Sequence, residues 1–101
     1  MILYNVTITI DPQVEQEWIT WMKGVFIPEM MKTECFVEHK FLRLKTDRPD
    51  VDGITYAIQY FASNEDQIQF YMENYAHQLG KLHAERFGTR SASFSTLLEE
   101  V

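Results

Sequence analysis

Apolar and polar residues alternate at the start of the chain. Residues 2–10 place apolar side chains at the even positions, with Asn5, Thr7 and Thr9 between them. A period of two with many β-branched residues predicts a β-strand that has one fully apolar face.

A helical spacing follows this strand. Asp11 provides an N-cap and Pro12 suits the first helical position. Gly24 weakens the end of the helix, and Pro28 predicts a separate short helical turn that ends near Lys32. The apolar stripe of the first helix contains Val14, Trp18, Trp21, Met22 and Val25.

Two more strands are predicted in the middle of the chain. Residues 36–45 mix charged and apolar groups on both faces, which suits a strand at a sheet edge. Residues 46–53 are polar, contain Pro and Gly, and predict a turn. Residues 54–62 form the next strand, whose apolar face carries Ile54, Tyr56, Ile58 and Tyr60.

The last third of the chain predicts a long helix and a final strand. Residues 63–66, Ser-Asn-Glu-Asp, resemble a capping box, and Gly88 is placed to end the helix. Residues 90–98 alternate as a fourth strand. The buried stripe of the helix is predicted to hold Ile68, Met72, Tyr75, Leu79 and Leu82.

The element order β-α-β-β-α-β predicts an α+β, ferredoxin-like domain that spans residues 1–101. Its four-stranded antiparallel sheet carries two helices on one face. Right-handed crossovers place the first and third strands side by side at the centre.

The face of the sheet opposite the helices is expected to carry small, neutral, hydrogen-bonding groups. Such a surface suits packing on a second sheet with trapped water, which predicts a homodimer joined sheet to sheet. An ordinary solvated face is the alternative. The predicted interface contains Asn5, Thr7, Thr55, Gln59 and Ser93, and strand alternation adds Thr9, Ala57, Phe61, Ser91, Ser95 and Leu97.

Composition narrows the classes of partner. The net charge of −6 disfavours nucleic acid and anionic membranes, because both are bound through Lys and Arg. The N-terminal apolar run is too short and too polar for a signal peptide or a membrane span, so we expect a reduced, cytoplasmic setting. The single cysteine, Cys35, is interpreted as a small buried hydrophobe.

Aromatic side chains are the first candidate site. Tyr and Trp each bring a polar tip that needs a partner when it is buried. Their number favours either a cleft around a planar aromatic ligand or plain core packing. The candidate ligand-binding residues are Tyr4, Trp18, Trp21, Phe26, Tyr56, Tyr60 and Tyr75.

Histidines and arginines give weaker candidates. His77 and His83 are six residues apart on one helix and so face different ways. His39 could act as a base beside Arg43, or both belong to a solvated strand face. No metal-binding motif is present, and we expect neither a metal nor a cofactor. Arg86 and Arg90 flank the end of the last helix and are interpreted as structural.

The chain as a whole resembles the dimeric α/β-barrel superfamily, and within it a family of short bacterial proteins of unknown function. The resemblance is carried by YNVTITID at 4–11, WITWMKGVFIPEMM at 18–31, Cys35-Phe36, TYAIQYFA at 55–62 and FGTR at 87–90. It implies a pair of ferredoxin-like domains joined through their sheets.

The superfamily includes cofactor-free monooxygenases, heme-degrading enzymes, muconolactone-type isomerases and chlorite dismutase relatives. Many members have a histidine near the Ile-Pro after the first helix. Phe26 fills that position here, so the resemblance implies no histidine chemistry at this point and no axial ligand for heme.

The sequence therefore supports two functions of different class. The first is a non-catalytic protein that binds a small molecule or has a structural or accessory role. The second is a cofactor-independent monooxygenase or isomerase that acts on an aromatic molecule. Its substrate would be held by Tyr56, Tyr60 and Trp18, with Asn5 or Gln59 as the polar group if either side chain reached the cleft, and no acid/base pair can be named.

Overall fold

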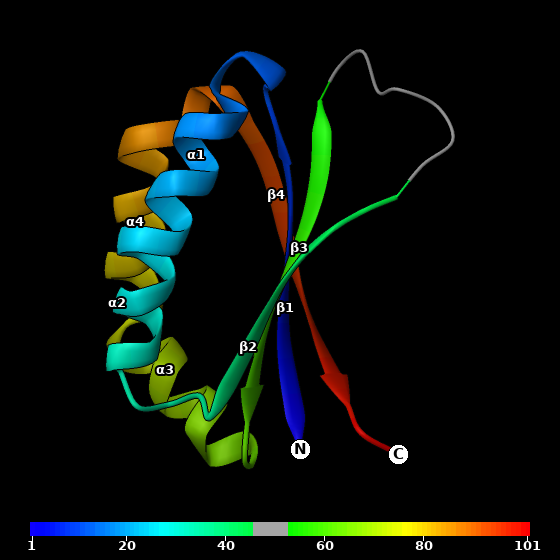
Figure 1. Ribbon diagram of the computed structural model, residues 1–101. Coiled ribbons are helices and arrows are strands. Elements are labelled where there is room, and N and C mark those ends of the chain that lie inside the picture. The colour runs from blue at the N-terminus through cyan, green and yellow to red at the C-terminus, as the bar shows by residue number, and fades with distance from the viewer. Residues whose placement is uncertain (46–52) are drawn as a thin grey trace.

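The computed structural model describes residues 1–45 and 53–101, so the predicted turn lies outside the described residues except for Gly53. Its four strands are β1 (Ile2–Ile10), β2 (Glu38–Arg43), β3 (Ile54–Ala62) and β4 (Ser91–Glu99). They form one antiparallel sheet in the order β2-β3-β1-β4. The helices all lie on one face of this sheet (Figure 1). The predicted ferredoxin-like arrangement is confirmed, with the first and third strands at the centre.

The first helical region is continuous, so the short helical turn predicted at Pro28 is not separate, but it ends at Lys32 as predicted. It comprises η1 (Pro12–Val14), α1 (Glu15–Trp21), η2 (Met22–Phe26) and α2 (Ile27–Lys32). The Asp11 cap is confirmed, because its carboxylate accepts a hydrogen bond of 2.8 Å from the N–H of Gln13. The segment η2 is a π-helix, in which the N–H of Ile27 donates to the carbonyl of Met22. Pro28 lacks an N–H, and the wider turn just before it absorbs the missing bond of the helical ladder.

The predicted long helix is two helices, α3 (Glu65–Asn74) and α4 (Ala76–Phe87), which meet at Tyr75 with φ −130°. The cap of α3 is Asn64, whose side chain accepts from the N–H of Gln67 at 3.0 Å, one residue after the start of the predicted capping box. Gly88 is the C-cap of α4, as predicted, and the short η3 (Gly88–Arg90) follows.

The predicted buried stripes of the helices are partly wrong. Met72 and Leu82 are 41% and 37% exposed, and Val25 of the first helical region is exposed as well. Met72 lies beside the buried Tyr71 in α3 and Leu82 lies beside the partly buried His83 in α4, so at both positions the neighbouring residue is the one nearer the core. The buried positions of α3 and α4 are Ile68, Tyr71, Leu79 and Phe87.

Strand β4 faces opposite to the prediction. Residues paired across antiparallel strands point to the same side of a sheet. Ser93 pairs with Ile8, so it faces the helices, whereas Phe94 pairs with Thr7 and faces away. Ser91, Ser95 and Leu97 share the helix side with Ser93, which removes Ser93 from the predicted dimer interface.

We call the side of the sheet away from the helices the open face. Its central strands keep the residues predicted for it, and β4 adds a different and more apolar set. The open face contains Leu3, Asn5, Thr7 and Thr9 from β1, Glu38, Lys40 and Leu42 from β2, Thr55, Ala57, Gln59 and Phe61 from β3, and Ala92, Phe94, Thr96 and Leu98 from β4.

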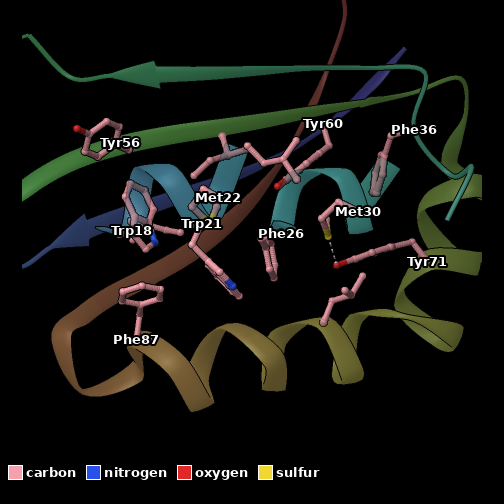
Figure 2. Close-up of a cluster of buried hydrophobic side chains, with 14 of the residues drawn as sticks. Trp18, Trp21, Met22, Phe26, Met30, Phe36, Tyr56, Tyr60, Tyr71 and Phe87 are labelled. Atoms are coloured by element: carbon pink, nitrogen blue, oxygen red, sulfur yellow. Dashed lines mark hydrogen bonds between the residues drawn. The ribbon is translucent and has the colours of Figure 1, made fainter. Parts of the chain in front are cut away.

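The core between the helices and the sheet is rich in aromatic rings (Figure 2). Trp18 is fully buried, and its Nε1–H donates to Nε2 of His83 at 3.0 Å, which ties α1 to α4. An indole N–H can only donate, so Nε2 of His83 is the unprotonated nitrogen and the hydrogen lies on Nδ1. Burial lowers the pKa of His83, so its ring is neutral at pH 7.

This histidine makes stability depend on pH. Because its pKa is lower in the folded chain than in the unfolded chain, the unfolded chain binds the proton more readily, and stability falls as the pH drops below about 6.5. We expect His83→Gln, whose amide oxygen can still accept from Trp18, to lose less stability between pH 7.5 and pH 5.5 than the wild type. Urea unfolding at both pH values measures this. His77→Gln, at an exposed site on α4, is the control and should keep the wild-type loss. Equal losses in all three proteins would contradict the assignment.

Candidate functional site

A cleft of about 280 Å³ lies between the helices and the sheet, with α4 on one side and β4 on the other. This volume is just below the usual range of small-molecule pockets, so the cleft suits a small ligand. Its floor is the helix side of the two central strands. The floor residues are Tyr4, Val6, Ile8, Ile58 and Tyr60.

The roof of the cleft is built from the helices. Met22 and Phe26, the two ends of η2, and Met30 of α2 contribute flexible and aromatic apolar groups. Tyr71 of α3 completes the roof, and its hydroxyl donates to the sulfur of Met30 at 3.2 Å (Figure 2). Burial raises the pKa of both Tyr60 and Tyr71, so their hydroxyls stay protonated and can donate.

The mouth of the cleft lies between α4 and β4. Ala76, Gly80 and His83 line it from the helix, and Ser93 and Ser95 line it from the strand. A Cβ built on Gly80 meets no atom within 4 Å, so this position borders open space. A glycine inside a helix costs about 1 kcal/mol relative to alanine. The small residues of α4 therefore leave room beside β4 at some expense in helix stability.

Polar groups in the cleft are neutral and free to bind. No Asp, Glu, Lys or Arg within the described part of the chain lines it. The hydroxyls of Tyr60, Ser93 and Ser95 and the Nδ1 of His83 have no hydrogen-bond partner among the described residues. An apolar cleft with a few such groups suits a neutral organic molecule.

The aromatic residues predicted for a ligand site fall into three groups. Tyr4, Phe26 and Tyr60 line the cleft. Trp18 and Trp21 do not line the cleft but contact His83. Trp18 is hydrogen-bonded to it, and the ring centre of Trp21 lies 5.9 Å from that of His83. Tyr56 and Tyr75 lie outside the cleft, and Tyr75 borders a surface groove between α2 and α4.

Tyr56 belongs to a polar link at the edge of the sheet. Its hydroxyl donates to Glu15 at 2.5 Å and accepts from Nε of Arg43 at 3.0 Å. Burial raises the pKa of Tyr56, and the hydrogen bond to Glu15 raises it further. The link joins β2, β3 and α1, and it accounts for Arg43 in structural terms. His39 shares the helix side of β2 with Arg43, is exposed, and does not line the cleft.

The remaining charged candidates are also structural in their contacts. Nε of Arg90 donates to Asp11 at 2.8 Å, which fastens the start of β4 to the start of the first helical region. The guanidinium of Arg86 lies over the ring of Trp21 at 5.5 Å. Within residues 1–45 and 53–101, His, Cys, Asp and Glu form no group that could hold a metal ion.

Sequence reasoning missed several residues of the cleft, namely Met22, Met30, Tyr71, His83, Ser93 and Ser95. One signal for His83 was available, because it stands four residues after Leu79 and four before Phe87, on one helical stripe. No signal marked Ser93 or Ser95, since alternation alone does not say which phase of an edge strand faces inward.

Comparison with solved structures shows the same fold at low sequence identity. A protein of the ethyl tert-butyl ether degradation (EthD) family from Bacillus halodurans superposes with a TM-score of 0.71 at 15% identity, covering all of both chains. HapK from Hahella chejuensis gives 0.70 at 12%, covering 100% of this chain and 93% of that chain. A dimeric ferredoxin-like protein from an uncultured marine organism gives 0.65 at 11%, covering 99% and 98%.

The remaining findings concern curated proteins, membrane-spanning helices and protein families. No curated protein matches the chain. No helix in the described ranges is long and apolar enough to cross a membrane. The model of the family DUF4286, a domain of unknown function, matches residues 1–101. Because the match covers the full printed sequence, this chain belongs to the DUF4286 family.

Proposed function

We propose that this protein is a homodimeric small-molecule-binding protein whose ligand is a small, neutral, mostly aromatic compound held in the cleft. The observation that carries the proposal is a cleft lined by rings and methionines, with unpaired neutral polar groups and no charged side chain among the described residues. An ion placed there would lose its hydration without gaining a charged partner, so a neutral ligand is favoured.

The dimer rests on the open face. Phe94 and Leu98 are 63% and 46% exposed there, beside Thr, Asn and Gln side chains of the central strands. The amide oxygen of Asn5 is shielded from solvent yet accepts no hydrogen bond from a described residue. A second copy packed on this face would cover the apolar groups and offer donors to Asn5. Two solved neighbours are themselves described as dimeric ferredoxin-like proteins.

A cofactor-independent monooxygenase or isomerase acting on an aromatic molecule is the second candidate. One structural neighbour is an antibiotic biosynthesis monooxygenase, with a TM-score of 0.63 at 11% identity. Proton abstraction would need a base in the cleft, and His83 is the natural choice. Its lone pair already accepts from Trp18, which favours binding without catalysis.

Ligand binding can be tested by filling the cleft. We expect 2-naphthol to bind the wild type and to shift the amide signals of residues around the cleft in an NMR titration. Charged analogues, 2-naphthoate and 2-naphthylmethylammonium, should bind about tenfold more weakly or not at all, because no charged side chain of the lining pairs with them.

Gly80→Phe should abolish 2-naphthol binding by filling the mouth of the cleft. Gly24→Phe is the matched control, since a Cβ there also meets no atom within 4 Å and Gly24 does not line the cleft. Equal binding by both variants would place the ligand elsewhere, and equal affinity for charged and neutral probes would contradict the neutral ligand.

The dimer can be tested by placing a charge on the open face. We expect sedimentation velocity to show a dimer for the wild type at high micromolar concentration and a monomer for Phe94→Lys, because the lysine would be buried unpaired at the interface. Phe94 is exposed in the single chain, so the change should leave folding intact. Leu82→Lys, a similar change on α4, should remain a dimer. A wild-type monomer at this concentration would overturn the proposal.

A further inference from the structure

The position of the hydrogen on the imidazole of His83 limits the chemical class of ligand that the cleft can bind. Trp18 determines that position. Its indole N–H has one role, which is to donate, and it does so to Nε2 of His83 at 3.0 Å. The bond leaves no lone pair on His83 for a ligand, because the remaining nitrogen, Nδ1, carries the hydrogen. In this state His83 can donate but cannot accept.

The protein around His83 holds the ring in place. The rings of Trp21, Phe26 and Phe87 lie with their centres between 5.7 and 6.0 Å from that of His83. These neighbours are apolar surfaces that offer the imidazole no alternative acceptor or counter-ion. Packing and the Trp18 bond together fix one orientation and one tautomer of the ring.

The other polar groups of the lining fix no polarity of their own. Tyr60 is a buried phenol that keeps its proton, and it has no partner among the described residues. The hydroxyls of Ser93 and Ser95 can rotate to donate or accept, so they exclude nothing. Like these hydroxyls, the phenol of Tyr60 can donate or accept, so the polarity that is fixed in the cleft is that of His83, a donor.

We propose that His83 is the specificity-determining residue of the cleft, where it acts as a fixed hydrogen-bond donor, and that the ligand is an aromatic compound that presents a carbonyl-type acceptor to it. This inference rests on the proposed ligand-binding function and names the chemical class within it. An aromatic amine or a plain hydrocarbon of the same size would leave the donor unpaired on binding, which a buried polar group tolerates poorly.

Three bicyclic probes of the same shape test the inference: 1-tetralone, which carries one carbonyl, tetralin, which carries none, and 1-aminotetralin, which is a cationic donor. In calorimetric titrations of the wild type we expect 1-tetralone to bind three- to tenfold more tightly than tetralin, the range for one hydrogen bond, and 1-aminotetralin to bind most weakly.

Substitution of His83 should remove this preference. His83→Phe keeps a flat ring but has no donor, so the two affinities should become equal. His83→Gln offers an N–H donor again and should restore part of the difference. A carbonyl preference that persists in His83→Phe would overturn the inference, because another group would then be the donor.

The tautomer can be measured without any substitution. Long-range ¹H–¹⁵N NMR of the wild-type protein should show Nδ1 of His83 protonated and Nε2 unprotonated, and a protonated Nε2 would overturn the inference even if the variants fail to fold. If none of the probes binds the wild type, the proposed ligand site itself fails. If 1-tetralone and tetralin bind equally well, the ligand site stands and the role of His83 is rejected.

Discussion

β1 is hydrogen-bonded to a strand on each side, and these two registers determine where every side chain of the sheet points. Ile8 stands opposite Tyr56 on β3 and Ser93 on β4, so all three face the helices. A slip of one residue in either pairing would send the whole set of that strand to the other side. The cleft and the open face both follow from this constraint, because one is the helix side of β1 and its neighbours and the other is the reverse side of the same strands.

The helices complete the cleft through two departures from regular geometry. The π-helical turn η2 carries the chain past Pro28 without a break, and its first and last residues, Met22 and Phe26, both reach the roof. The break at Tyr75 divides the second helical region, and α4 then presents small residues to β4. The Trp18–His83 bond joins α1 to α4, and the ring of Trp21 packs against that of Phe87 with a centre-to-centre distance of 5.3 Å.

Much of the fold is predictable because residues 2–10 and 54–62 are buried on one side, which leaves a clear period of two. Almost all residues of the edge strand β4 are exposed, so its alternation does not indicate which residues face the helices, and the prediction for Ser93 is wrong. No Pro or Gly marks the helix break at Tyr75 in the sequence. His83 lies on the helical stripe of Leu79 and Phe87, but its role depends on Trp18, which the sequence does not place beside it.

The Trp18–His83 bond also bears on whether the cleft binds or transforms its ligand. If Nε2 took a proton from a substrate, the indole N–H of Trp18 would be left facing another donor in a buried site. An orphaned buried donor costs about 1–3 kcal/mol, which corresponds to one or two powers of ten in rate. Donation from Nδ1 carries no such penalty, because the neutral ring and its bond to Trp18 both persist. The hydrogen bond that closes the core therefore favours a ligand held by donation over a substrate from which a proton is removed.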